Sequence, residues 1–168
     1  MPLALLSLIW TSVVIFIVAI ACGLRLWGAA SFMQNHIASA LTATIVALFA
    51  HTMTMFYFIG TGKKIKEFAS SWDRSIQQDI RGKIVAMKRK IFPHMTLICL
   101  VLVTAFILGG AHSVRLITKG IHSFFAYGAL VYHVHVAVLE TIFIFRNLSL
   151  IQEVNNLHQQ TGVKSVGH

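Results

Sequence analysis

Charged side chains are scarce in this sequence, and acidic ones are almost missing. Only 11% of the 168 residues are charged, and five acidic residues stand against 14 Lys and Arg. Hydrophobic residues make up 57% of the chain, and the mean hydropathy of +0.76 is well beyond the balance of a soluble domain. The composition predicts an integral membrane protein. We expect residues 1–168 to form a single transmembrane domain, so any large catalytic module would be a separate subunit.

Cysteines are also few, and they indicate no metal or disulfide framework. Cys22 and Cys99 both lie within apolar runs and lack the paired spacing of such sites, so we interpret them as packing residues. The net charge of +9 would suit a nucleic-acid partner, but the basic residues cluster beside apolar runs and no nucleic-acid module is recognisable. We therefore predict the lipid bilayer and other subunits of a membrane complex as partners, and no nucleic acid.

Four apolar stretches are long enough to cross a bilayer as helices. They cover residues 3–26, 35–60, 92–112 and 121–145. The fold class predicted is all-α: an integral membrane four-helix bundle with a basic, amphipathic helical segment at residues 63–90, which Gly82 could interrupt. Pro93 is expected in the first turn of the third span. The polar tail 146–168 is expected to be partly disordered.

The basic residues predict the orientation in the membrane. Eleven of them belong to residues 63–90 and the tail, whereas Arg25, Arg115 and Lys119 lie on the other side. The positive-inside rule therefore predicts a multi-pass protein of the inner (plasma) membrane with both termini in the cytoplasm.

Residues 63–90 carry an apolar stripe that offers a docking face for a partner subunit or for anionic lipid headgroups. The docking candidates on this stripe are Phe68, Trp72 and Ile76. The alternative is that the segment packs on itself as an extension of the flanking spans. The sequence leaves both interpretations open.

The fourth span, residues 121–145, carries three histidines and one glutamate. At about 100° per residue, His122, His133 and Glu140 share one narrow stripe, and His135 points nearly the opposite way. An ionisable side chain inside a span is costly and indicates a functional site. Glu140 is a candidate for proton relay.

The predicted depths of the histidines suggest that they meet across the bundle. His36, His112 and His122 are expected near the non-cytoplasmic surface, His94 and Glu140 near the cytoplasmic boundary, and His51 and His133 deep in the bilayer. Small residues at Ala40, Ala43, Gly128, Ala129 and Ala137 could leave room for a flat macrocycle between the helices.

Inward imidazoles at matched depths are typical of metal and haem sites in helical bundles. The arrangement is similar to that of membrane b-type cytochromes, whose four-helix cores carry two haems stacked across the bilayer. The sequence leads us to expect one or two haems b, with His36, His51, His122 and His133 as axial ligands through which the iron is held. His94, His112 and His135 are reserve candidates. A haem-binding electron-transfer subunit would anchor a larger oxidoreductase and exchange electrons with quinone, without being a catalytic subunit itself.

Two other functions fit the same residues. Histidines at helix ends are ordinary, so the chain could be a noncatalytic scaffold or accessory subunit whose histidines bind pigment or nothing. The polar stripe could also belong to a small metal or proton transporter.

Overall fold

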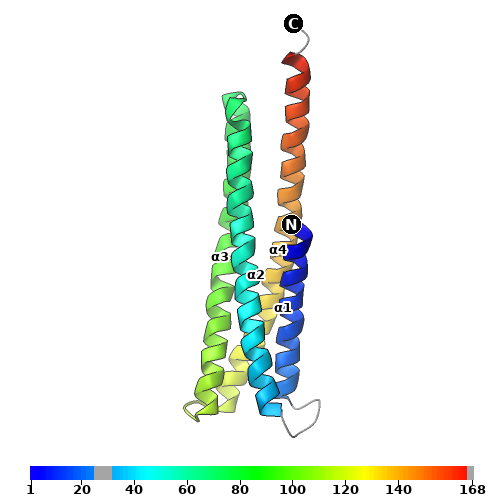
Figure 1. Ribbon diagram of the computed structural model, residues 1–168. Coiled ribbons are helices and arrows are strands. Elements are labelled where there is room, and N and C mark those ends of the chain that lie inside the picture. The colour runs from blue at the N-terminus through cyan, green and yellow to red at the C-terminus, as the bar shows by residue number, and fades with distance from the viewer. Residues whose placement is uncertain (25–31, 166–168) are drawn as a thin grey trace.

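The computed structural model describes residues 1–24 and 32–165, and it is helical nearly throughout these ranges. The elements are α1 (Pro2–Gly23), α2 (Phe32–Phe68), the short 3₁₀ helix η1 (Ala69–Ser71), α3 (Arg74–Ser113) and α4 (Lys119–Ser165). The helices run alternately up and down, and each of the four α-helices is long and apolar enough to cross a membrane (Figure 1). The all-helical prediction is confirmed. Residues 25 and 26 of the predicted first span and residues 166–168 of the tail lie outside the described residues.

Three of the helices are longer than a membrane requires. Helix α1 has 22 residues and spans roughly 33 Å, about the thickness of a bilayer core. Helices α2, α3 and α4 have 37, 40 and 47 residues and continue past Met1 as a three-helix extension (Figure 1). The extension comprises residues 63–90 and the part of α4 that follows Arg146.

The extension corrects three expectations about the helix ends. Pro93 lies inside α3 rather than in its first turn, and Gly82 does not interrupt that helix. Ile91 and Met95 on either side of Pro93 are fully buried, so packing holds α3 together across the one backbone hydrogen bond that proline removes. The tail is helical as far as Ser165, because Leu150 and Val154 are buried against the other helices of the extension.

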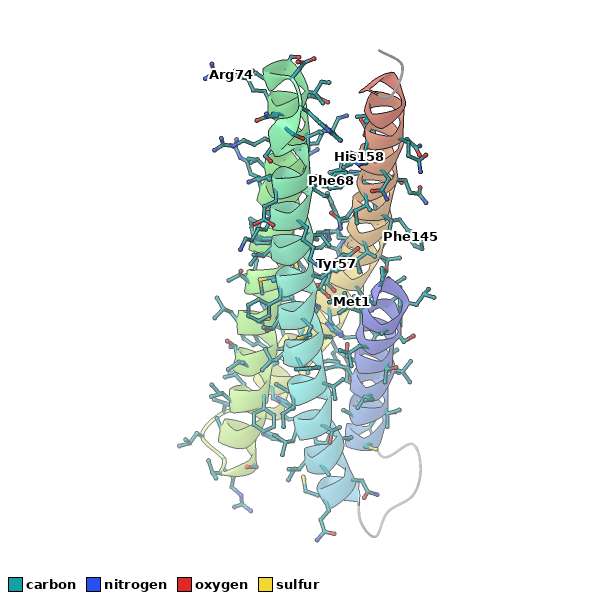
Figure 2. All side chains as sticks on the ribbon, turned by 45° about the horizontal axis from the view of Figure 1, so that its top comes forward. Met1, Tyr57, Phe68, Arg74, Phe145 and His158 are labelled. Carbon is teal, nitrogen blue, oxygen red and sulfur yellow. The ribbon has the colours of Figure 1, made fainter. Side chains whose placement is uncertain are left out.

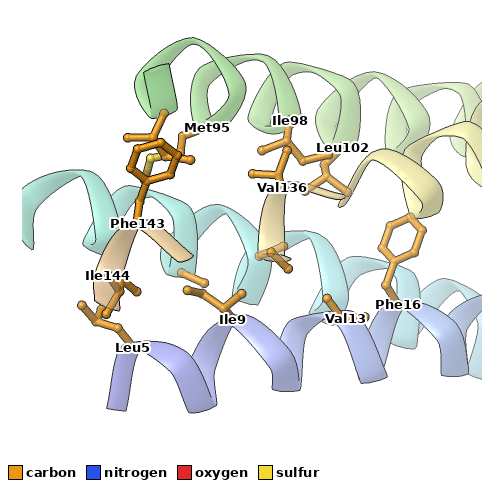
Figure 3. Packing of buried hydrophobic residues seen from close by; sticks show 14 of the residues in the cluster. Leu5, Ile9, Val13, Phe16, Met95, Ile98, Leu102, Val136, Phe143 and Ile144 are labelled. Atoms are coloured by element: carbon orange, nitrogen blue, oxygen red, sulfur yellow. The ribbon is translucent and has the colours of Figure 1, made fainter. Parts of the chain in front are cut away.

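The main core lies between the four helices (Figure 3). Large side chains from all four helices fill it: Leu5, Ile9, Val13 and Phe16 of α1, Tyr57 and Phe58 of α2, Met95, Ile98 and Leu102 of α3, and Val136, Phe143 and Ile144 of α4. Helix α2 also contributes Ala43, Ala47 and Ala50, and such small residues allow close helix approach. Helix α2 packs on both α1 and α3, and α4 also packs on both α1 and α3. Helices α2 and α4 therefore face each other diagonally across the bundle.

A second core stabilises the extension. Its buried members come from all the elements there: Ile65, Ala69, Ile80, Ile84, Leu150 and Val154. On its surface Lys83 donates to Glu153 at 2.6 Å and lies 3.0 Å from Asp79. These two hydrogen bonds raise the pKa of the Lys83 ammonium, with Glu153 contributing most. The bridge joins α3 to α4.

The stripe expected to dock a partner lies at the tip of the extension. Trp72 and Ile76 pack partly against the second core, whereas Phe68 remains 43% exposed. The ring of Phe68 contacts His158 of α4 with ring centroids 4.5 Å apart (Figure 2). Part of the stripe therefore packs on the chain itself, and docking stays a prediction.

We expect Ile84→Ala to destabilise the extension. Truncating a fully buried isoleucine removes packing and leaves a cavity, at a cost of about 2–5 kcal/mol. Hydrogen exchange of the backbone amides in residues 63–90 should then become faster. Val85→Ala is the matched control, because the neighbouring Val85 is 51% exposed. Equal exchange rates in the two variants would contradict the second core.

Candidate functional site

Four polar side chains form a continuous hydrogen-bonded chain in the main core. Glu140 Oε1 lies 2.9 Å from His51 Nδ1, and His51 Nε2 lies 3.1 Å from His133 Nδ1. His133 Nε2 lies 3.1 Å from Ser12 Oγ, whose hydroxyl donates to the Ile9 carbonyl at 2.6 Å. None of the four side chains is exposed. This deep chain, Glu140–His51–His133–Ser12, links α4, α2 and α1.

The serine fixes the direction in which the deep chain donates its hydrogens. Because the Ser12 hydrogen is used on Ile9, Ser12 Oγ must accept from His133 Nε2–H. A neutral His133 then has no hydrogen on Nδ1, which accepts from His51 Nε2–H. One further proton is shared between Glu140 Oε1 and His51 Nδ1. Two proton arrangements are therefore possible: a neutral pair, or a carboxylate beside an imidazolium.

The carboxyl end of the deep chain is incompletely bonded. Glu140 Oε2 is buried without a hydrogen-bond partner among the described residues. A buried carboxylate oxygen without a partner is costly, whereas the carbonyl oxygen of a protonated carboxyl loses less by burial. The geometry therefore favours a proton on Glu140 that it donates to His51.

A second group of imidazoles lies near the ends of the spans that are opposite the extension. This outer site consists of His36, His112 and His122. The ring of His122 is in the middle, with centroids 6.2 Å from His36 and 5.8 Å from His112. His36 Nδ1 lies 2.8 Å from the Ala19 carbonyl of α1. Since a carbonyl only accepts, Nδ1 carries the hydrogen and a neutral His36 has a free lone pair on Nε2.

Two glycines make room for these rings. A Cβ at Gly23 would come within 2.9 Å of the His36 ring, and one at Gly109 within 3.2 Å of the His122 ring. Both distances are shorter than ordinary van der Waals contact, so a larger residue would displace the imidazole. Gly109 thus allows α3 to approach the His122 ring of α4 closely.

The turn between α3 and α4 positions the other two rings of the outer site. Arg115 adopts a left-handed conformation with φ of 62°, and its N–H bonds to the His112 carbonyl at 3.0 Å. His112 thus lies where α3 closes. Thr118 Oγ1 accepts from Ile121 N–H at 3.4 Å, which caps the first turn of α4 just before His122.

The structure brings the four predicted axial ligands together in two pairs. His36 meets His122, and His51 meets His133, in each case across the diagonal between α2 and α4. His112, held in reserve, joins the outer site. His94 and His135 do not enter the interior: they lie with Tyr132 on the outside of the α3–α4 pair, and His135 is exposed. Gly128 is on this outer side as well, so it makes no room in the core.

Sequence reasoning missed Ser12 and the contact between His51 and Glu140. A serine in an apolar span is a weak signal, because its hydroxyl often bonds to its own helix. The only way to find Ser12 would have been to align its depth with that of His133. Glu140 was expected near the membrane boundary. Its contact with His51 depends on the relative position of α2 and α4 along the bundle axis, which no sequence motif predicts.

The two levels of histidine fit a haem differently. At the outer site His36 is anchored, and the Nδ1 atom of the half-buried His122 is buried without a hydrogen-bond partner among the described residues, so both rings keep ligating capacity. At the deep level the His51 and His133 nitrogens are hydrogen-bonded at 3.1 Å, whereas two metal–imidazole bonds of about 2.0–2.1 Å each span about 4 Å. At the outer site, ligation of iron by His36 Nε2 would leave the hydrogen bond of its Nδ1 to the Ala19 carbonyl intact. The deep pair fits only after its rings turn away from each other.

A site made wholly of protein ligands is not evident in the part of the chain that the structure describes. No three His, Cys, Asp or Glu side chains there are grouped as they would be around a metal ion. Haem needs only two, because the porphyrin supplies the other ligands of the iron.

Comparison with models of protein families, with curated proteins and with solved structures finds no match. The functional argument therefore rests on the residues of the chain itself.

We expect Ser12→Ala to destabilise the bundle, because His133 Nε2–H would remain buried without an acceptor. The cost of such an orphaned donor is about 1–3 kcal/mol. The midpoint of thermal unfolding in detergent measures it. Ser7→Ala on the exposed side of α1 is the matched control and should leave the midpoint unchanged. If the two variants unfolded alike, the deep chain would not stabilise the bundle.

Proposed function

We propose that the protein is a haem-b-binding electron-transfer subunit that anchors a larger oxidoreductase in the membrane. One observation carries this proposal: two diagonal helices, α2 and α4, each direct two histidines inward, and these meet pairwise at two levels. The levels are 15 residues apart on α2 and 11 on α4, or roughly 22 and 16 Å along the helices. Diagonal helices are well suited to ligate a flat group from both of its faces.

The outer site supports binding of haem most directly. His36 and His122 would be the axial ligands, with the Ala19 carbonyl fixing the ring of His36. The glycines at positions 23 and 109 lie against these rings, where any side chain would intrude. Haem iron supplies reversible one-electron transfer, which no side chain at this site provides. The chain's own contribution is to orient two neutral imidazoles.

The proposed orientation follows from the basic residues and agrees with the shape of the molecule. The extension carries most of the Lys and Arg residues, and the positive-inside rule places it in the cytoplasm together with both termini. Such an extension projects roughly 25 Å beyond the membrane, since residues 74–90 alone add about 17 rises of 1.5 Å. It offers a surface for soluble subunits, including the exposed ring of Phe68.

A second candidate function is proton transfer, and the deep chain favours it. Its hydrogen bonds are continuous over four groups and all donate in one direction, from Glu140 toward Ser12. Hydrogen-bonded His and Glu side chains inside a bundle are typical of proton relays. As a transporter the protein would move protons without bound haem, and as an electron-transfer subunit it would bind haem.

The optical spectrum of the purified protein, oxidised and dithionite-reduced, distinguishes the two functions. We expect a haem b spectrum, and we expect His36→Ala and His122→Ala each to remove a low-spin signal while the protein stays in the membrane. His158→Ala is the control, because this histidine lies in the extension. A full spectrum in both outer-site variants would refute the ligand assignment.

A colourless parent protein would refute the electron-transfer function. Proton flux in liposomes then tests the alternative, in which Glu140→Leu abolishes the flux and Glu153→Leu does not. Glu153 is the matched carboxylate, since it lies in the extension and is half-exposed.

A further inference from the structure

Three polar rings lie together on the outside of the bundle, between α3 and α4. His94 Nδ1 is 3.0 Å from the Tyr132 hydroxyl. The His135 ring lies 5.9 Å from that of His94 and 6.1 Å from that of Tyr132, and the rings of Tyr132 and His135 are inclined by only 21°. His94 and Tyr132 are half-buried, and His135 is exposed. We call these three residues the lateral cluster.

The lateral cluster belongs to the part of the bundle that faces lipid hydrocarbon. His94 follows Lys90 by four residues, or roughly 6 Å, and His135 precedes Arg146 by 11 residues, or roughly 16 Å. Its surroundings on the surface are apolar: Leu97, Val131 and Val138 are all exposed. An imidazole on this surface is costly unless something pairs with it.

The lateral cluster always keeps a hydrogen to donate outward. Neutral His94 and Tyr132 carry one polar hydrogen each, and the bond between them uses one of the two, whichever tautomer is present. The other remains free. His135 has a further N–H, and it makes ring contacts but no hydrogen bond to the described residues. Two hydrogens of the lateral cluster therefore remain available for donation, from rings whose centroids lie 5.9 and 6.1 Å apart.

We infer that the lateral cluster is the binding site of a quinone, a substrate class that gives the proposed electron-transfer function its partner. The occupant must reach the site through lipid and bring an acceptor into the hydrocarbon. Ester carbonyls of phospholipids lie at the interface, above His135, which is roughly 16 Å from Arg146 along α4. A quinone carbonyl has two lone pairs and accepts from both donors, and the isoprenoid tail lies along the apolar surface.

The shape of α4 at this place suits a flat ring. Gly128 lies one turn before Tyr132 on the same outer side, and a Cβ there would meet no atom within 4 Å. The absence of a side chain leaves space next to the nearly parallel rings of Tyr132 and His135, where a planar headgroup can stack. His133, between these two residues in sequence, faces the interior, so one turn of α4 joins the quinone site to the deep level.

Equilibrium binding of a decyl-tailed benzoquinone to the full chain in nanodiscs tests the inference without requiring haem. We expect saturable binding to the parent protein. His135→Leu and the double variant His94→Leu/Tyr132→Phe should each weaken it roughly tenfold, because each removes one of the two donors and thus one hydrogen bond. Tyr127→Phe is the matched control, because Tyr127 is also exposed on α4 but lies outside the lateral cluster, and it should bind as the parent does.

Haem content measured on the same samples separates this inference from the proposed function. Normal haem with binding that is not saturable, or that is unchanged in both cluster variants, would overturn the quinone site and leave the electron-transfer function standing. Saturable, cluster-dependent quinone binding to a protein without haem would support the site and refute the haem-binding function. Equal weakening in Tyr127→Phe would also overturn the site, because the loss would then not depend on the cluster.

Discussion

The deep chain is the interaction on which the rest of the bundle depends. Inside an apolar bundle water cannot satisfy imidazole, carboxyl and hydroxyl groups, so they must satisfy one another. Each of the three hydrogen bonds between Glu140, His51, His133 and Ser12 fixes a distance between two helices. Sliding α2 against α4 by one turn would orphan both nitrogens of His51. Apolar packing alone tolerates such a slip far better, and the chain therefore sets the register of α1, α2 and α4.

Hydrogen bonding and iron ligation compete for the same nitrogen atoms at the deep level. A neutral imidazole has one N–H and one lone pair, and His133 uses the first on Ser12 and the second on His51. Binding of a metal by His133 must break one of these bonds. The outer site carries no such conflict, because His36 donates to a backbone carbonyl and keeps its lone pair. The two levels are therefore chemically unlike, although each is a pair of histidines from the same two helices.

Much of this architecture follows from the sequence. Apolar length gives four helices, and the stripe of His122, His133 and Glu140 gives the inward face of α4 because three residues share one angle on a helix. The same angular argument places His135 on the opposite side, where the structure has it. Depth along α2 and α4 pairs His36 with His122 and His51 with His133.

What the sequence could not give depends on packing between segments far apart. The polarity of the residues after 146 suggested disorder. They are helical because Leu150 and Val154 pack with Ile80 and Ile84 of α3 in the second core. Pro93 lies within a helix since the buried residues around it outweigh one missing hydrogen bond. Ser12 contacts His133 because of the relative position of α1 and α4 along the bundle axis. The sequence of one helix does not predict its position relative to another.

Helix α4 contributes residues to the deep chain on its inner face and to the lateral cluster on its outer face. Tyr132 and His135 turn toward lipid, and His133 turns inward to His51, so one helical turn carries polar groups on both of its sides. A span that only had to cross the membrane would be apolar on its outer side, because lipid offers no hydrogen bonds. Under the proposal above, the polar outer side requires a partner that travels within the bilayer. A quinone meets that requirement, and reduction of its carbonyl oxygens needs protons as well as electrons. Glu140, about two turns after His133 on α4, shares a proton with His51 of α2. The proposed quinone site would then have a proton donor on the opposite face of the same helix.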